Sequence, residues 1–189
     1  MPPTFDILII GAGIMGCSTA LELAQRGLKV AVLEKKQVGA GGTGKSSAII
    51  RQHYSNLLTA RMAKYSLEVF QNFAERVGGE CGFTRVGFLV LVAEKDRPGL
   101  EANIAMQRSV GIRTELLSPA ALAALIPQMD AAELVAAAWE PESGYADPWL
   151  TVNAYAAAAR AAGARFFLNT PVTGLRLAGG KIQGVDTPA

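Results

Sequence analysis

The stretch that decides the fold is F-D-I-L-I-I-G-A-G-I-M-G, residues 5–16. Its first six residues are mostly apolar, which predicts a buried strand. Three glycines follow in the spacing G-x-G-x-x-G, at Gly11, Gly13 and Gly16. The first permits a tight turn out of the strand, the second lets the backbone approach a pyrophosphate, and the third lets a helix pack closely on the strand. The stretch therefore predicts a turn that can hold a phosphate group.

The residues after these glycines complete a strand–helix–strand unit. Apolar positions from Cys17 to Arg26 recur at helical spacing, and Gly27 ends the pattern. A second apolar run, Val30 to Leu33, predicts a strand that ends in Glu34. An acid about 20 residues past such glycines hydrogen-bonds the diol of a ribose, and its charge disfavours the 2′-phosphate of NADP. The whole unit predicts a dinucleotide site rather than an ordinary glycine-rich turn.

Length and composition bound the remaining possibilities. The chain has 189 residues, enough for one domain or two small ones with a sizeable core. Half of the residues are hydrophobic and 18% are charged, which is typical of a globular protein. The net charge is +2 and the basic residues are scattered, so no nucleic-acid partner is predicted. No apolar run approaches the roughly 18 residues of a membrane span.

Thiols, histidine and the N-terminal residues exclude further classes. Cys17 and Cys81 form no C-x-x-C pair, which fits packing residues in a reducing compartment. His53 is the only histidine, so no metal site is predicted. The opening M-P-P-T has no charged region and no cleavage site, so no signal peptide is predicted. We therefore expect a cytoplasmic protein.

The segment GAGGTGKS, residues 39–46, has the letters of a phosphate-binding P-loop. The strand before it already ends at Glu34, and the residues after it give no clear helix. No later strand ends in the aspartate that a nucleoside triphosphatase supplies for magnesium. A nucleoside triphosphatase is therefore kept only as a minor alternative.

The rest of the chain alternates helical and strand patterns. Apolar residues from Leu57 to Val77 recur at helical spacing and stop at Gly78 and Gly79. Beyond them the expected strands are 83–86, 87–92, 135–139, 165–168, 172–177 and 181–185, the expected helices are 96–110, 118–126 and 151–162, and residues 140–148 are expected to form a loop.

The order of these patterns predicts two interleaved domains. A mixed α+β stretch follows the opening unit, and the later helix and strand from Thr151 to Leu168 are typical of the next crossover of the first sheet. We therefore expect an α/β fold. Its Rossmann-like cofactor-binding domain takes residues 1–79 and 141–189, and an inserted α+β segment of a substrate domain takes residues 80–140.

Three stretches make the chain resemble the flavin-dependent amine oxidoreductases of the D-amino-acid oxidase type. They are DILIIGAGIMG through VLEK, then GGTGKSSAIIRQHY, and finally WEPESGYADP with the following helix, GARF and TPVTGL. Within that family the chain is most similar to the β subunit of sarcosine oxidase and to dimethylglycine dehydrogenase-like proteins. The resemblance covers essentially the whole chain. It implies the N-terminal portion of such an enzyme, truncated at the C-terminus, with both domains incomplete.

The resemblance implies FAD as the cofactor, with its adenosine half on the glycine turn and Glu34. Lys35 follows where family members contact adenosine, and a solvated lysine is the alternative. The loop from Thr43 to Ile49 matches the segment that passes the pyrophosphate and the flavin ring, with an ordinary surface loop as the alternative. The backbone of Val172 matches a position that meets the adenine. The implied cofactor-binding residues are Gly11, Gly13, Ile14, Met15, Gly16, Glu34, Lys35, Thr43, Ser46, Ser47, Ala48, Ile49 and Val172.

The resemblance also implies that Arg51 binds the substrate carboxylate. A guanidinium can bind a carboxylate through two parallel hydrogen bonds, and Arg51 matches the second arginine of the R-I-I-R pattern of monomeric sarcosine oxidase. The first arginine of that pattern is Ala48 here, and a surface arginine in a salt bridge is the alternative for Arg51. His53 is expected to be packed or solvated. Lys45 stands where dimethylglycine dehydrogenase attaches its flavin, so that particular covalent linkage is not predicted, and no catalytic residue is assigned.

One function is favoured and two alternatives stay open. The favoured function is FAD-dependent oxidation of the C–N bond of a small secondary or N-methylated amino acid, similar to sarcosine or dimethylglycine. Its partners would be that small molecule and, in addition, a second copy or a second subunit. The alternatives are a non-catalytic cofactor-binding fragment or subunit, and an NAD-dependent dehydrogenase, because the unit from Gly11 to Glu34 would serve NAD equally well.

Overall fold

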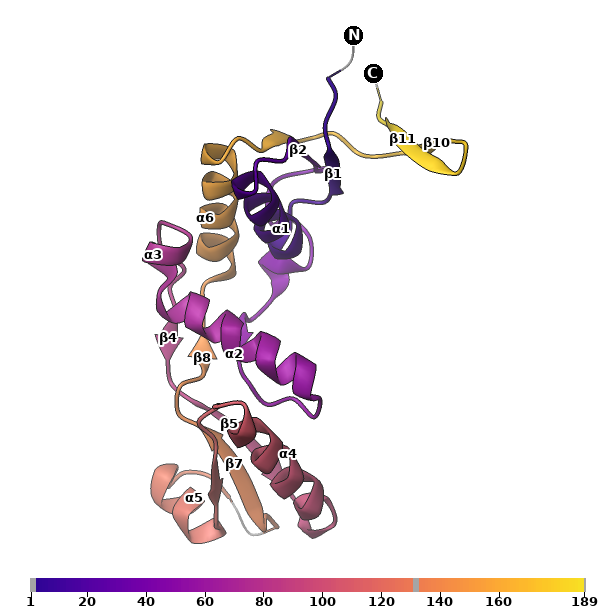
Figure 1. Ribbon diagram of the computed structural model, residues 1–189. Helices are drawn as coiled ribbons and strands as arrows, with labels where there is room; N and C mark the ends of the chain where they lie inside the picture. Colours follow the sequence, from indigo (N-terminus) through magenta and orange to yellow (C-terminus); the bar gives the residue numbers. More distant parts are fainter. Residues whose placement is uncertain (1–2, 131–132, 189) are drawn as a thin grey trace. The chain divides into compact units, whose positions relative to one another are not determined.

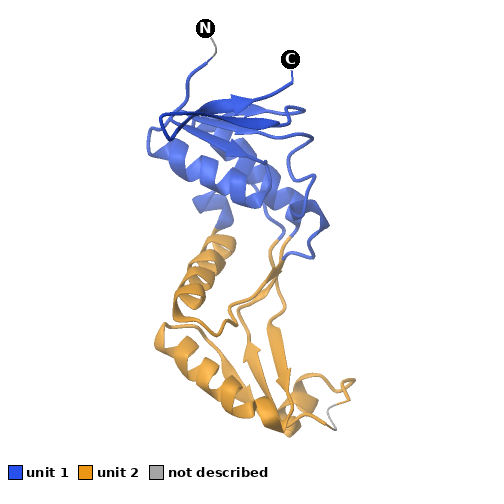
Figure 2. Cartoon of the chain, turned by 90° about the vertical axis from the view of Figure 1, so that its right-hand side faces the viewer, with its two compact units in different colours: residues 1–48, 73–82, 147–189 blue, residues 49–72, 83–146 orange. Residues whose placement is uncertain are grey.

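The structure is a computed structural model that describes residues 3–130 and 133–188. The chain forms two compact units (Figure 2). Unit 1 contains residues 1–48, 73–82 and 147–189, and unit 2 contains residues 49–72 and 83–146. Residues 49–72, which the predicted boundaries gave to the cofactor domain, cluster with unit 2. The assignment of cofactor and substrate domains itself stays a prediction.

Unit 1 is built on a parallel sheet of three strands, in the order β1, β2, β9. Strand β1 (Ile7–Ile10) pairs with β2 (Val30–Leu33), and β2 pairs with β9 (Arg165–Phe167). Helix α1 (Ile14–Gln25) joins the first two strands, so the predicted strand–helix–strand unit is present (Figure 1). Its helix begins three residues before the predicted Cys17, directly after Gly13.

Helix α1 packs against helix α6 (Pro148–Ala161) on one face of this sheet. Small residues on both helices allow a close approach, which explains the alanine-rich sequence of α6. The buried core of unit 1 consists of Ala12, Cys17, Ala20, Leu21, Ala24, Val30, Val32, Val38, Val152, Ala156, Ala159 and Ala164.

The start of α6 corrects the predicted loop at residues 140–148. Pro148 occupies the first turn of the helix, and the carboxylate of Asp147 caps it by accepting hydrogen bonds from the N–H groups of Trp149 and Leu150 at 2.8 and 2.9 Å. Aspartate followed by proline is a favoured helix start. The helix therefore begins three residues before the predicted Thr151.

Shorter elements complete unit 1. They are the single 3₁₀ turn η1 (Thr43–Lys45), the short helix α3 (Phe73–Arg76) and the antiparallel hairpin of β10 (Gly174–Ala178) and β11 (Lys181–Asp186). The helix predicted from Leu57 to Val77 is thus wrong as one element, because α2 (Leu57–Gln71) ends at Asn72 and α3 is separate.

Unit 2 contains two small antiparallel sheets. In the larger one β7 (Ala136–Glu140) lies between β5 (Phe88–Val92) and β6 (Glu115–Leu117), and helix α4 (Arg97–Ser109) packs on it through Leu100 and Ile104. The turn η2 (Glu94–Asp96) precedes α4, and α5 (Pro119–Leu125) follows β6.

The second sheet of unit 2 has strands of only two residues. Strand β8 (Gly144–Tyr145) pairs with both β3 (Ile49–Ile50) and β4 (Thr84–Arg85). The prediction that residues 140–148 form a loop is therefore wrong at β8 as well. This sheet matters for function because Arg51 directly follows β3.

Candidate functional site

The glycine turn has the geometry that its sequence predicts. Gly11 has a φ of +102°, a conformation that L side chains rarely adopt, and its N–H donates to the carbonyl of Leu33 at 2.8 Å. A Cβ on Gly16 would overlap the carbonyl oxygen of Gly11. The first and last glycines therefore fix the close packing of α1 on the end of β1.

The N-terminus of α1 carries no acidic residue and no side-chain cap from Gly13. The N–H of Ile14 donates to the hydroxyl of Thr43 at 3.0 Å, and this hydroxyl lies 3.0 Å from where a Cβ on Gly13 would be. Met15 next to it is 77% exposed. Since the first N–H groups of a helix lack intrahelical partners and carry partial positive charge, this end suits an anion such as a pyrophosphate.

Glu34 lies at the end of β2, half-buried, with its carboxylate turned back to the glycine turn. One oxygen accepts a hydrogen bond from the N–H of Ala12 at 2.9 Å, and the other accepts from the N–H of Lys36 at 2.8 Å. Each carboxylate oxygen can accept a second hydrogen bond. The carboxylate is thus held in place with acceptor capacity left for the hydroxyl groups of a ribose.

A hollow of about 260 Å³ opens beside this carboxylate. Four residues implied in cofactor binding lie together there: Gly11, Glu34, Lys35 and Val172. The other lining residues are Ile10, Leu33 and Pro171. The hollow thus combines a carboxylate that can accept hydrogen bonds from a ribose diol with apolar walls that can contact a base. These features fit the adenosine half of FAD.

The loop after η1 contains the remaining predicted cofactor-binding residues of unit 1, which are Ser46, Ser47 and Ala48. Ser46 and Ser47 are exposed, and the N–H of Ala48 already donates to the hydroxyl of Ser46 at 2.9 Å. Ala48 has a φ of +47°, a conformation uncommon for alanine. Because residues 43–45 form only one 3₁₀ turn and no helix follows directly, the segment is not a P-loop. Ile49 belongs to β3 in unit 2.

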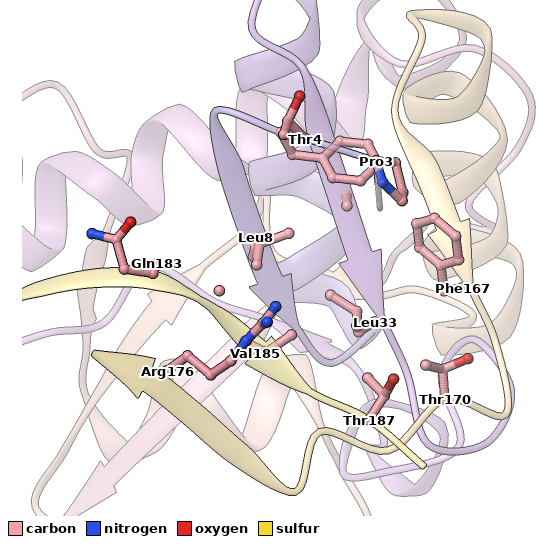
Figure 3. A pocket seen from close by; sticks show the side chains of 13 residues that line it. Pro3, Thr4, Leu8, Leu33, Phe167, Thr170, Arg176, Gln183, Val185 and Thr187 are labelled. Carbon is pink, nitrogen blue, oxygen red and sulfur yellow. The ribbon is translucent and has the colours of Figure 1, made fainter. Parts of the chain in front are cut away.

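A second hollow in unit 1, of about 400 Å³, lies on the sheet face away from α1 and α6 (Figure 3). Leu8, Leu33 and Phe167 line it from the strands, and Arg176 and Val185 line it from the β10–β11 hairpin. None of the predicted site residues lines this hollow.

Unit 2 has a hollow of its own, and Arg51 is one of the residues that line it. The structure half-buries its side chain, whose Nη1 donates to the carbonyl of His53 at 2.6 Å. Its guanidinium carbon lies 4.6 Å from the ring centre of Tyr54 and 5.7 Å from that of Phe88. Since a guanidinium has five N–H donors, several remain to bind an anion. The hollow measures about 270 Å³ and is lined by Ile49, Ile50, Arg51, Tyr54, Thr59, Met62, Ala63, Ser66 and Phe70.

Two ionisable side chains beside Arg51 are buried. His53 is 8% exposed and Glu140 is fully buried, and their Nδ1 and Oε1 atoms lie 3.4 Å apart. His53 is packed, which is one of the two alternatives predicted for it, whereas Glu140 was not among the predicted site residues. The available signal was a charged residue that ends the apolar strand pattern of residues 135–139.

Cys17 is a buried core residue of α1. Burial is the main cause that raises the pKa of its thiol to about 11, while Arg160 lowers it and Glu34 raises it.

Within residues 3–130 and 133–188, no cluster of histidine, cysteine and acidic side chains can hold a metal ion. No helix in those same ranges is long and apolar enough to span a bilayer.

The chain matches a known protein family over nearly its whole length. The family model described as FAD dependent oxidoreductase, DAO, matches residues 6–189. The solved structure of L-proline dehydrogenase from P. horikoshii is 34% identical with a TM-score of 0.90, over 99% of this chain and 50% of that one. The predicted α/β cofactor-binding fold is thereby confirmed.

Curated relatives are more distant. Sarcosine oxidase subunit beta of Rhodobacter capsulatus is 28% identical over 97% of this chain and 46% of its own length. The mitochondrial pyruvate dehydrogenase phosphatase regulatory subunit of Mus musculus is 29% identical over 99% of this chain and 22% of its own. The chain thus spans half or less of the length of each protein that it is compared with here.

Proposed function

Because the chain belongs to the DAO family of FAD-dependent oxidoreductases, we propose that it forms the cofactor-binding and carboxylate-binding part of an amino-acid oxidoreductase. The proposed reaction is oxidation of the C–N bond of a small secondary or N-methylated amino acid to an imine, which water then hydrolyses. The observation that carries the proposal is the gathering of Gly11, Glu34, Lys35 and Val172 around one hollow, at the glycine turn that leads into α1.

The adenosine and pyrophosphate parts of FAD have matching features in unit 1. Glu34 would accept hydrogen bonds from the ribose hydroxyl groups, and the apolar walls of the hollow would contact the adenine. The N–H groups at the start of α1, with the hydroxyl of Thr43 beside them, would bind the pyrophosphate. The remaining implied residues, Ser46, Ser47, Ala48 and Ile49, would continue toward the flavin. FAD supplies the two-electron acceptor that amine oxidation needs.

Arg51 would bind and orient the carboxylate of the amino acid. Its hydrogen bond to His53 and its position over the ring of Tyr54 hold the guanidinium in one orientation before a ligand arrives. A fixed fork loses less side-chain entropy on binding than a mobile one. This residue would therefore determine that the substrate is an amino acid rather than a simple amine.

The substrate class follows from what two similar proteins are named for. Sarcosine and L-proline, named in the bacterial subunit and in the archaeal dehydrogenase, share a secondary amine next to a carboxylate. The test is anaerobic mixing of the purified flavin-loaded protein with sarcosine, N,N-dimethylglycine or L-proline. Loss of the absorbance of the oxidised flavin with at least one of them supports the proposal. Unchanged absorbance with all three contradicts it.

A second candidate is a cofactor-binding subunit that performs no turnover. The similarity to a protein named as a regulatory subunit of a phosphatase favours this alternative. It predicts retained FAD without substrate-dependent bleaching in the same experiment. The NAD-dependent dehydrogenase considered from the sequence has no support from the family match.

Partner and compartment are proposals of the same kind. One similar protein is named as the β subunit of its enzyme, which supports a second subunit as the partner of this chain. A cytoplasmic location stays a prediction, since some relatives are named as mitochondrial.

A further inference from the structure

Each of the three residues directly after Arg51 has one backbone group that is hydrogen-bonded to a side chain. The N–H of Gln52 donates to Oε2 of Glu140 at 2.8 Å. The carbonyl of His53 accepts from Arg51 itself at 2.6 Å, and the carbonyl of Tyr54 accepts from Nε2 of Gln107 at 3.3 Å. Residues 52–54 therefore have an anchored backbone although they lie outside any helix or strand.

The two anchoring side chains are the fully buried Glu140 and Gln107, both 0% exposed. They come from different elements, the end of β7 and the last turn of α4. A buried carboxylate is costly unless it is hydrogen-bonded, and Glu140 is held by both the Gln52 N–H and the Ser143 hydroxyl, the latter at 2.9 Å.

Glu140 is linked to Arg51 by two further routes. Its Oε1 lies 3.4 Å from Nδ1 of His53, whose carbonyl accepts the Arg51 hydrogen bond. Its backbone pairs with Phe88 across β5 and β7, and the Phe88 ring faces the guanidinium at 5.7 Å. Glu140 thus lies beside two of the groups that orient Arg51, His53 through its carboxylate and Phe88 through its backbone.

We propose that Glu140 and Gln107 are positioning residues that hold residues 52–54, and through them fix the Arg51 guanidinium for a substrate carboxylate. Neither residue touches the ligand. Their role is to keep the N–H donors of the guanidinium in one orientation, so that substrate binding does not cost the entropy of ordering this side chain. This inference rests on the carboxylate-binding role proposed for Arg51.

The test uses the purified flavin-loaded protein and methoxyacetate, in which an ether oxygen replaces the amine of sarcosine so that no oxidation occurs. Its Kd is read from the change in flavin absorbance. Glu140→Ala is expected to raise this Kd at least tenfold, while Glu140→Gln stays within about threefold, because the amide oxygen still accepts from Gln52 and Ser143. Glu142→Ala is the matched control. Glu142 is a half-buried glutamate two residues further on, and its change is expected to leave the Kd unaltered.

Gln107→Met keeps the side-chain volume and removes only the hydrogen bond to Tyr54, so it tests the inference even if Glu140→Ala does not fold. A Kd raised at least threefold, with FAD content unchanged, supports the positioning role. An unchanged Kd in Gln107→Met and Glu140→Ala, with only a lower Tm, would mean a merely structural role and overturns the inference.

Arg51→Lys separates this inference from the proposed function. If Arg51→Lys leaves the Kd unaltered, or if the unaltered protein does not bind methoxyacetate, the proposed role of Arg51 fails. The crystal structure of Gln107→Met then decides the inference without any ligand. A guanidinium displaced from the His53 carbonyl supports positioning, and an unmoved guanidinium overturns it.

Discussion

The carboxylate of Glu34 accepts a hydrogen bond from the backbone N–H of Ala12 at 2.9 Å, although the two residues are 22 positions apart. This bond ties the acid at the end of β2 to the middle of the glycine turn. The same carboxylate accepts from the N–H of Lys36 at 2.8 Å. The residue proposed to bind ribose therefore also shapes the turn proposed to bind the pyrophosphate.

Replacing Glu34 with glutamine tests this double role. The Ala12 and Lys36 N–H groups bind different oxygens of Glu34, and in glutamine one of these positions is an amide NH₂ group that cannot accept. Glutamine also lacks the charge that strengthens a bond to a ribose hydroxyl. We expect the Kd of the apoprotein for FAD to rise about tenfold, equivalent to ~1.4 kcal/mol. Quenching of flavin fluorescence measures it. Glu22→Gln on the exposed side of α1 is the control, and equal losses in both variants would contradict the role of Glu34.

Thr43 offers a test of the helix N-terminus. Thr43→Val keeps the shape of the side chain but removes the oxygen that accepts from the Ile14 N–H at 3.0 Å. FAD affinity is expected to fall by about tenfold, since a neutral hydrogen bond is worth roughly 1 kcal/mol and the cofactor contact is lost with it. Thr43→Ser should retain the affinity. The hydroxyl is irrelevant if the valine and serine variants titrate with FAD alike.

Two glycine-to-alanine changes are expected to act in opposite directions. Gly16→Ala places a Cβ onto the carbonyl of Gly11, which forces α1 away from β1 and costs about 2 kcal/mol of folding free energy. Gly99→Ala in α4 meets nothing within 4 Å and gains about 0.5–1 kcal/mol of helix stability. Urea unfolding of both variants measures the difference. A Gly16→Ala protein as stable as the unaltered one would show that the helix does not pack as described.

Cys17 gives a prediction about pH. Its folded pKa of about 11 lies above the ordinary value of 9.0, so its thiol contributes stability that is present below pH 9.0 and is lost as the pH rises toward 11. At a pH of about 8.5, below the ordinary pKa of 9.0, the native thiol stays protonated and inaccessible. We expect iodoacetamide to leave Cys17 unmodified in the native protein and to alkylate it in urea, as read by peptide mass spectrometry. Alkylation at the same rate in both states would place Cys17 outside the core.

Helices and strands were predictable from the sequence wherever apolar residues recur over several positions at helical or strand spacing. The strands of the parallel sheet and helix α1 follow from apolar runs and from the glycine spacing, both of which are local signals. Strands β3 and β8 have two residues each, too few to show any alternation, so they were missed. The start of α6 was readable in principle, because Asp147 followed by Pro148 is a helix-start signal that was taken for a loop.

The site divides in the same way. Gly11 and Glu34 belong to a motif whose spacing is fixed by one supersecondary unit, so the sequence was enough to predict that these two residues lie together. Val172 lies outside that unit and was predicted beside them only through the family resemblance. The buried Glu140 was not predictable, because its burial depends on Gln52, 88 positions earlier in the chain. In the sequence, a carboxylate that contacts a residue so far away along the chain cannot be told from any other charged residue at the end of a strand.

The central claim is that unit 1 holds FAD through the glycine turn and Glu34. Its most direct test is the identity of the cofactor released by heat from the purified protein, determined by mass spectrometry. The account predicts FAD in the unaltered protein and a clear loss of FAD in a Gly16→Ala, Glu34→Gln double variant that still folds. Release of no flavin after FAD has been offered, or retention of NAD in its place, would contradict it.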